Sequence, residues 1–245
     1  DSVTAYGMYF ISLTSSAIHN NDISLTSTSQ ITGTYLGSGN WKVRYYNNRI
    51  HDLTTTGASS LCFGINLSGT STLGEAAIFN NFIWNFNPPA AGTNAVYGIY
   101  HTTAGPVPDT IAYNTICLTG TTAGNKATFA YYRASSTGAS YLYNNILKNE
   151  RTDGTTGVAV AIFKSAGATV LESDHNDLYV GTPDARHVTG CIATNNYLTL
   201  ADWRAANGTD VASFAENPPF VSATDLHITP GSATQLESGG VPIVS

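Results

Sequence analysis

Short segments of this chain alternate apolar and polar residues at period two, which predicts β-strands rather than helices. One sequence marker recurs six times. It consists of an apolar residue, two residues of any type and then Asn-x-Ile or a close variant. Its asparagine falls at Asn21, Asn48, Asn81, Asn114, Asn145 and Asn176, in steps of 27, 33, 33, 31 and 31 residues. A regular repeat of about this length is typical of repeat architectures.

A second marker recurs with the same spacing. It consists of an aromatic residue, Gly or Ala, an apolar residue and a Tyr-like residue in succession. Its copies are Tyr6–Tyr9, Thr32–Tyr35, Phe63–Asn66, Tyr97–Tyr100, Phe129–Tyr132 and Val160–Phe163. The Gly or Ala of each copy precedes the next marker asparagine by 14 to 17 residues. Each unit is too short to bury its own apolar face, so it must stack on its neighbour. We therefore predict an all-β parallel solenoid of about six coils of about 31 residues over residues 1–198.

The two markers give the chain a resemblance to the right-handed parallel β-helix, or pectin-lyase-like, superfamily, and to β-helix modules of secreted bacterial surface proteins. The Asn-Asn-x-Ile segments resemble the turn between the second and third sheets of that family. Asparagine tolerates the left-handed backbone of such a turn, and stacked side-chain amides can form a hydrogen-bonded ladder. The resemblance implies the fold and its right-handed coil, and we expect a ladder of the six marker asparagines.

Residues 199–245 do not contain the repeat. Their sequence predicts a C-terminal cap made of a short helix, a loop and a final strand. Thr199 and Asp202 form a capping-box pattern, and Asn207-Gly208 supplies a stop. A cap is expected because an open solenoid end exposes apolar core and strand edge. No comparable cap begins the sequence, so we expect further coils of a larger parent protein, or another chain, at that end.

Composition excludes several classes of protein. Only 11% of the residues are charged and the net charge is −6, which argues against a coiled coil, a helical bundle or a basic nucleic-acid-binding surface. No apolar run approaches the length of a membrane span. The three cysteines, Cys62, Cys117 and Cys191, have no metal-binding spacing and are expected to be buried. The charge-poor, Ser/Thr/Asn/Gly-rich composition favours an extracellular or cell-surface location, and no cofactor is expected.

The second marker predicts a candidate ligand surface. If Ile65, Ile99 and Ile162 point inward, the Gly/Ala column and the Tyr-like column should point outward. The expected aromatic stripe consists of Tyr9, Tyr35, Asn66, Tyr100, Tyr132 and Phe163. Beside a flat groove of Gly and Ala, such a stripe suits the C–H faces of sugar rings. The alternative is that the stacked rings only stabilise the sheet.

A basic column one position further along supplies the candidate catalytic residues His101, Arg133 and Lys164. Parity often breaks at strand ends, so these side chains can face outward. A uronate lyase needs groups that neutralise a carboxylate, abstract a proton and protonate the leaving oxygen, and these residue types can do so. The alternative is three solvated charges at a turn.

Acidic residues give weaker candidates. Glu172 and Asp174 share a parity but Asp177 lies beyond the turn, so no metal site is predicted. Asp109 and Glu75 lie one coil apart and were considered as a hydrolase pair.

Three functions remain open from the sequence. The leading hypothesis is a non-catalytic module of a larger secreted or cell-surface protein, a spacer or adhesin contacting a polysaccharide or cell-surface glycan. The alternatives are a polysaccharide lyase or glycoside hydrolase, and a phage tailspike-like adhesin.

Overall fold

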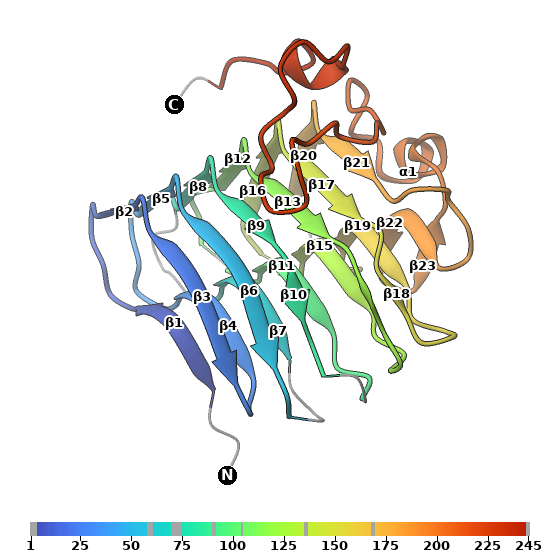
Figure 1. Ribbon diagram of the computed structural model, residues 1–245. Helices are drawn as coiled ribbons and strands as arrows, with labels where there is room; N and C mark the ends of the chain where they lie inside the picture. Colours follow the sequence, from blue (N-terminus) through green and yellow to red (C-terminus); the bar gives the residue numbers. More distant parts are fainter. Residues whose placement is uncertain are drawn as a thin grey trace.

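A computed structural model describes residues 4–57, 61–69, 75–89, 92–103, 105–134, 137–167 and 170–243. The described chain is an all-β parallel solenoid with three long sheets, as the sequence predicts. Figure 1 shows the strands of successive coils stacked side by side, following the chain from one end of the stack to the other.

The first sheet is formed by the strands that carry the second marker: β1 (Ala5–Phe10), β4 (Ile31–Leu36), β7 (Cys62–Leu67), β11 (Val96–His101), β15 (Thr128–Arg133), β19 (Ala159–Lys164), β22 (His187–Ile192) and the antiparallel β23 (Asn195–Tyr197). The second sheet contains β2 (Ala17–His19), β5 (Arg44–Tyr46), β8 (Ala77–Phe79), β12 (Asp109–Ala112), β16 (Ala139–Tyr143) and β20 (Val170–Asp174).

The third sheet contains β3 (Asp22–Ser27), β6 (Arg49–Thr55), β9 (Phe82–Trp84), β10 (Phe86–Asn87), β13 (Thr115–Leu118), β17 (Ile146–Asn149) and β21 (Asp177–Tyr179). A small extra sheet pairs β14 (Thr121–Thr122) with β18 (Thr152–Asp153). The solenoid makes about five turns, slightly fewer than the six coils expected. The difference lies in the counting, since the six strands of the second sheet are separated by five steps.

The asparagine ladder lies at the corner between the second and third sheets. Each Nδ2 donates to the Oδ1 of the marker asparagine in the next coil, with N–O distances of 2.8–3.0 Å from Asn21 through to Asn176. The same Oδ1 atoms also accept backbone N–H bonds. The left-handed residue is the one before each ladder asparagine, with φ between 54° and 58°, at Asn20, Asn47, Asn80, Tyr113, Asn144 and His175. We call these six residues the corner column.

The Gly/Ala column of the second marker faces the core, which corrects the outward groove expected from strict alternation. Ala130 and Tyr131 are both fully buried in the main core, whereas Phe129 and Tyr132 on either side pack in a separate cluster on the outer face. Alternation therefore breaks at this position. A Cβ added at Gly98 would lie 2.5 Å from the Cγ2 of Ile116, so the missing side chain makes room for the isoleucine of the ladder motif.

The cap continues the solenoid with different elements. Helix α1 (Leu200–Asn207) starts at the predicted Thr199–Asp202 capping box and ends at Gly208, which has φ of 72°. Its fully buried Trp203 lies against Gly190 of β22, which pairs with Ile162 of the preceding coil. Ser213 Oγ accepts the N–H of Asn176 and so takes the place of a further ladder asparagine.

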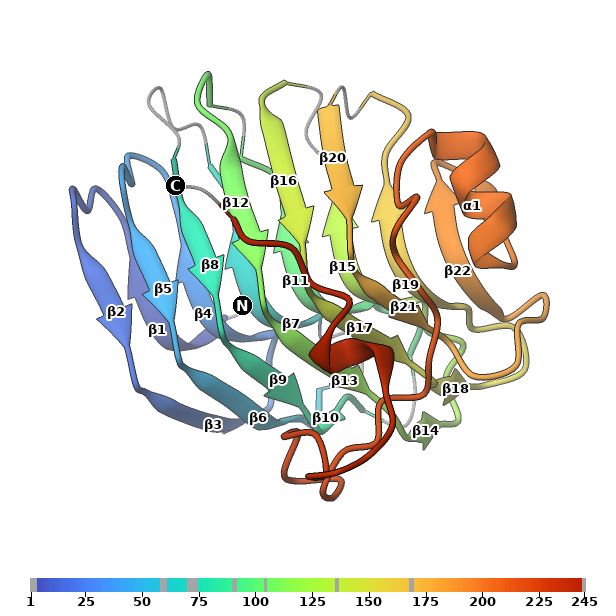
Figure 2. The same cartoon turned by 90° about the horizontal axis from the view of Figure 1, so that it is seen from above.

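Residues 209–243, which we call the C-terminal strap, then run back along the stack over the third sheet, as the red segment in Figure 2 shows. The strap contains the short 3-10 helix η1 (Gln235–Glu237). In place of the expected final strand, the described strap residues form isolated bridges from Phe214 to Asp177 and between Phe220 and Ile228. Pro218, Pro219 and Pro230 remove the N–H donors that a continuous strand would need.

Candidate functional site

The expected stripe residues share one register on the outer face of the first sheet. Tyr9 pairs with Tyr35, and the same column continues through Asn66, Tyr100, Tyr132 and Phe163. Neighbouring rings stack along it, with centroids 4.8 Å apart for Tyr9–Tyr35, 5.1 Å for Tyr100–Tyr132 and 4.2 Å for Tyr132–Phe163. This spacing matches the distance between adjacent strands.

A second aromatic column, not assigned to the site from the sequence, lies beside the first. It is formed by Tyr6, Phe63, Tyr97 and Phe129, and its rings meet those of the stripe edge to face, as in Tyr97–Tyr100 with centroids 4.9 Å apart. The break in alternation at the Gly/Ala column puts both columns on the outside. The signal was present as the first position of the second marker. Strict alternation with Ile99 inward and Gly98 outward would turn that position into the core, so the sequence did not indicate an outward column.

Accessibility is highest at the end of the two columns that lies farthest from the cap. Tyr9 and Tyr6 are 50% and 39% exposed, and Tyr35, Tyr97, Tyr100, Phe129 and Tyr132 are half-buried. Phe163, expected at the surface, is only 8% exposed because it packs with Val160, Val188 and Cys191. Phe63 is also buried, with 5% exposure, so we define the accessible part, which we call the aromatic face, as Tyr6, Tyr9, Tyr35, Asn66, Tyr97, Tyr100, Phe129 and Tyr132.

The basic column is in register but is not a surface feature. His101 pairs with Arg133 and Arg133 with Lys164, as the repeat requires. His101 and Arg133 are 0% and 1% exposed, so the outward orientation that we considered does not occur. Strand alternation simply continues past the outward Tyr100 and Tyr132 and turns both basic side chains into the solenoid.

His101 is instead the centre of a buried hydrogen-bond network. Its Nδ1 lies 2.9 Å from the Tyr131 hydroxyl, and its Nε2 lies 3.0 Å from Asp109 Oδ2 and 2.8 Å from Thr103 Oγ1. Arg133 donates to the backbone oxygens of Thr103, Thr137 and Gly138. These bonds join the end of the first sheet to the start of the second, which is a structural use of polar side chains.

The pKa shifts of His101 and Asp109 also agree with a structural role for this network. Burial, helped by the Arg133 charge, lowers the pKa of His101, so the ring is neutral at neutral pH. Burial alone would raise the pKa of the Asp109 carboxyl, but hydrogen bonds from His101, Thr103 and the Ala76 N–H hold it below its usual value. Lys164, the third member, is partly exposed and donates to Asn207 Oδ1 at the end of the cap helix, over an N–O distance of 3.0 Å.

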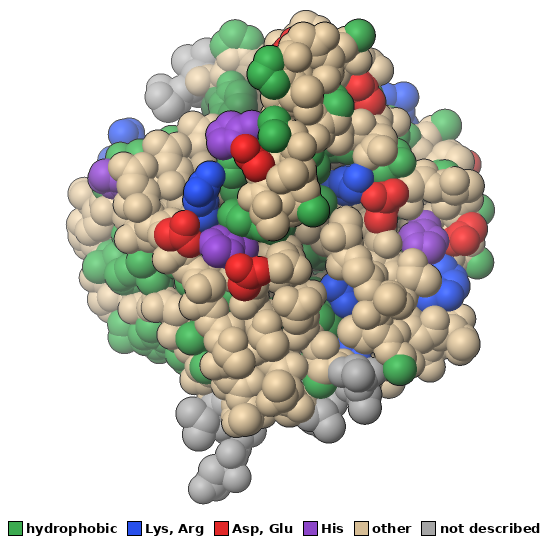
Figure 3. All heavy atoms as spheres, viewed as in Figure 1, with side chains coloured by type: hydrophobic (Ala, Val, Ile, Leu, Met, Phe, Trp, Pro, Cys, Tyr) green, Lys and Arg blue, Asp and Glu red, His purple; other side chains and the backbone are tan. Residues whose placement is uncertain are grey.

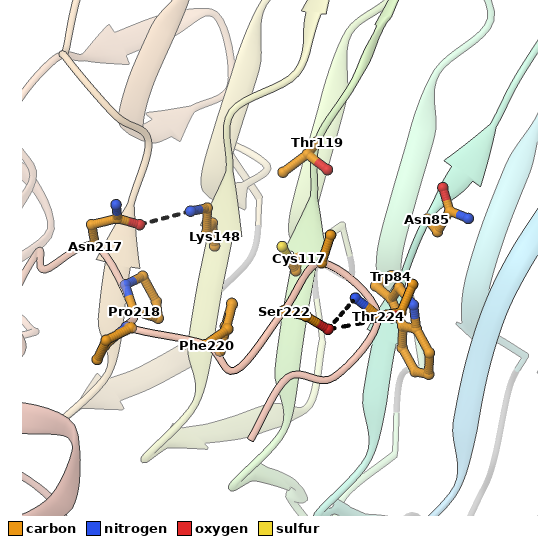
Figure 4. Close-up of a pocket in the computed structure, with 12 residues that line it drawn as sticks. Trp84, Asn85, Cys117, Thr119, Lys148, Asn217, Pro218, Phe220, Ser222 and Thr224 are labelled. Carbon is orange, nitrogen blue, oxygen red and sulfur yellow. Dashed lines mark hydrogen bonds between the residues drawn. The ribbon is translucent and has the colours of Figure 1, made fainter. Parts of the chain in front are cut away.

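A cavity of about 470 Å³ lies between the outer face of the third sheet and the C-terminal strap. Figure 4 shows its floor of Trp84, Cys117 and Thr119, with Phe220 of the strap opposite and Lys148 at one side. The Lys148 Nζ is 2.7 Å from Asn217 Oδ1 and 2.8 Å from Glu150 Oε2, so its charge is already paired. No histidine or acid is among the described lining residues, and the lining offers packing and hydrogen bonds rather than acid–base chemistry.

The remaining sequence candidates do not form a site in the described part of the chain. Asp177 is buried, whereas Glu172 is exposed and Asp174 is partly exposed, and Asp109 serves the His101 network. Among the described residues, no group of three or more His, Cys, Asp or Glu side chains is placed to hold a metal ion. Figure 3 shows charged side chains scattered over one face, with histidines beside acids, as His51 is beside Asp22 and Asp52.

The three cysteines are buried and free, as expected. No helix in the described ranges is both long and apolar enough to cross a bilayer. Comparison of the chain with family models, with curated proteins and with solved structures finds no match.

Proposed function

We propose that this chain is a non-catalytic β-solenoid module of an extracellular or cell-surface protein, and that it contacts a glycan through the aromatic face. The observation that carries the proposal is the pair of aromatic columns on the outside of the first sheet. Monomeric proteins seldom expose a large contiguous apolar surface without a binding role. We further propose, from the asparagine ladder and the three-sheet coil, a relationship to the right-handed pectin-lyase-like superfamily.

A glycan suits this face for geometric reasons. The rings repeat at about 5 Å along the solenoid axis, close to the length of one sugar unit, so a polysaccharide lying along the axis can meet a new ring with each sugar. Because the rings stack on one another, they offer the sugars mainly their edges, and the ring at the open end of the column, Tyr9, has the most exposed surface. The phenol hydroxyls of Tyr9, Tyr35, Tyr97, Tyr100 and Tyr132 can hydrogen-bond sugar hydroxyls at the same time. A flat face without a deep pocket favours a polymer over a single small molecule.

The burial of His101 and Arg133 supports recognition over turnover. The lyase alternative relied on His101, Arg133 and Lys164 together at the surface, and the first two are committed to hydrogen bonds inside the solenoid. A uronate lyase would need a cation to neutralise the substrate carboxylate, and the aromatic face as defined contains no Lys, Arg or His. Its tyrosine hydroxyls could act as acid or base, but without that cation they do not complete the lyase site.

The test is a glycan-array screen in which the same panel is assayed for unsaturated and reducing-end products. We expect binding without turnover, weakened about tenfold or more by the double substitution Tyr100→Ala plus Tyr132→Ala. Tyr46→Ala plus Phe79→Ala is the matched control, because it removes a stacked aromatic pair from the second sheet. Product formation by the wild type, or equal loss of binding in both double variants, would contradict the proposal.

A further inference from the structure

The corner column already binds one peptide backbone, which is that of the chain's own strap. The side-chain amide of Asn144 accepts the Val241 N–H, with an O–N distance of 2.9 Å, and donates to the Val241 carbonyl, with an N–O distance of 2.7 Å. The hydroxyl of Tyr113, one coil earlier in the same column, donates to the same carbonyl over 3.0 Å. Two neighbouring corner residues thus bind both backbone groups of one extended residue.

The same column continues beyond the strap with the same chemistry. Asn20, Asn47 and Asn80 occupy the corner positions of the three preceding coils, and their side chains are exposed. None of the three side-chain amides forms a hydrogen bond within the described ranges of the chain, so their donors and acceptors are available to a ligand.

These three asparagines line a second cavity, of about 400 Å³, together with Asn48, Arg49, Phe82, Tyr113 and His227. The strap forms one wall through His227, whose ring meets Phe82 edge to face with centroids 4.9 Å apart. The cavity therefore adjoins the strap, and Tyr113 belongs both to the cavity and to the Val241 contact. Arg49 adds an exposed cation, with no acidic partner within 4 Å in the described chain.

We propose that this cavity binds an extended peptide segment of another polypeptide, whose backbone N–H and C=O groups pair with the amides of Asn47 and Asn80 as Val241 pairs with Asn144. The mode is that of strand addition, except that side-chain amides at a solenoid corner replace a sheet edge. Arg49 favours a peptide that carries a carboxylate a few residues from the bound residue. This inference uses a different face from the aromatic face and does not depend on glycan binding.

The alternative role for these asparagines is the left-handed backbone alone, and the two roles can be separated. Glycine adopts φ near +55° more easily than asparagine, so Asn47→Gly and Asn80→Gly keep the corner and remove only the amide. A purely conformational role predicts that the double glycine variant is at least as stable and binds as well as the wild type. The proposed role predicts unchanged or higher stability with loss of peptide binding.

The probe is a fluorescein-labelled synthetic peptide of the sequence Glu-Ser-Gly-Gly-Val-Pro-Ile, which reproduces residues 237–243 and carries one carboxylate side chain. We expect saturable anisotropy with the wild type and at least a tenfold rise in Kd for Asn47→Gly plus Asn80→Gly. A probe containing N-methylvaline lacks the N–H that an asparagine Oδ1 would accept, and it should bind at least tenfold more weakly.

Asn144→Gly is the matched control. It removes the amide that holds the strap but leaves the cavity asparagines, so its affinity for the peptide should stay within about threefold of wild type. Absence of peptide binding would overturn the proposal, as would binding that survives the double glycine variant or is lost only in Asn144→Gly. Binding of an oligosaccharide, but not the peptide, to the wild type would also overturn it.

Discussion

At the scale of single residues, the two sequence markers supply the two residues of one recurring packing contact. Each Gly or Ala of the first sheet faces the apolar residue that follows a ladder asparagine in the third sheet. Four coils pair Gly with Ile, as Gly98 with Ile116, whereas the next two place Ala130 and Ala161 at the positions opposite Leu147 and Leu178. Isoleucine projects a Cγ2 methyl close to its backbone and leucine does not, so the smaller partner accompanies the β-branched residue.

This pairing predicts that a second substitution, at the isoleucine, restores part of the stability lost when the glycine is replaced. Gly98→Ala would place a Cβ 2.5 Å from Ile116 Cγ2 and 2.5 Å from the Ala130 carbonyl oxygen, so we expect a loss of about 1–3 kcal/mol in the free energy of unfolding. Adding Ile116→Leu reproduces the pairing of the later coils and should recover about half of that loss. Urea unfolding of the two single variants and the double variant measures the coupling. Additive costs in the double variant would show that the two positions do not determine each other.

At the scale of elements, the sequence predicts most of what the coils do and little of what the strap does. The regular spacing of the asparagines predicts the stacked coils, because the repeat is visible in the sequence itself. The capping box predicts helix α1, because it is a local motif. Strict alternation fails at the Gly/Ala column because Ala130 and Tyr131 both turn inward. That failure hid the second aromatic column. The strap has no periodic pattern, so its course over the third sheet depends on long-range contacts such as Asn144 with Val241.

The strap also buries a carboxyl group that should make stability depend on pH. Asp177 is 1% exposed, its Oδ1 accepts the Glu216 N–H over 2.9 Å, and its Oδ2 has no hydrogen-bond partner among the described residues. Burial is the main cause that raises the pKa of Asp177 to about 8. The hydrogen bond from the Glu216 N–H and the charge of Lys148 oppose this shift, and the charge of the Glu216 carboxylate adds to it. His175 lines the same small cavity under the strap.

The direction in which stability changes with pH follows from the proton that Asp177 binds in the folded and unfolded states. The unfolded chain releases this proton near pH 4, whereas the folded chain keeps it to about pH 8, so the free energy of unfolding falls as pH rises between these values. From pH 7 to pH 8 the loss approaches about 1 kcal/mol. Asp177→Asn keeps an acceptor for Glu216 and should remove that slope, becoming more stable than the wild type at pH 8.

Denaturant unfolding at pH 7, 7.5 and 8 measures this prediction. Asp202→Asn is the control, because hydrogen bonds from Thr199 lower the pKa of Asp202 and keep it ionised throughout this range. It should reduce stability by the same amount at each pH. A wild-type slope that persists in Asp177→Asn would assign the pH dependence to another group.

At the scale of the whole molecule, each interior ladder asparagine links its coil to the coils on both sides. In such a one-dimensional array, the cost of a lost contact depends on its position along the stack. Asn114 lies inside, where its side chain forms five hydrogen bonds with its own coil and both adjacent coils. Asn21 lies in the first described coil and donates from Nδ2 to Asn48 Oδ1 and the His19 carbonyl.

We therefore expect the same substitution to have unequal effects. Asn114→Ala leaves the Asn81 N–H and the Ile78 carbonyl buried without their partner, which should cost at least about 3 kcal/mol because each buried unsatisfied group costs about 1–3 kcal/mol. Asn21→Ala acts at a partly exposed position and should cost about 1 kcal/mol or less. Native-state hydrogen exchange locates the loss, which for Asn114→Ala should spread through the coils on both sides. Equal costs, or a loss confined to one coil, would mean that the ladder stabilises each corner separately rather than linking the coils into one cooperative unit.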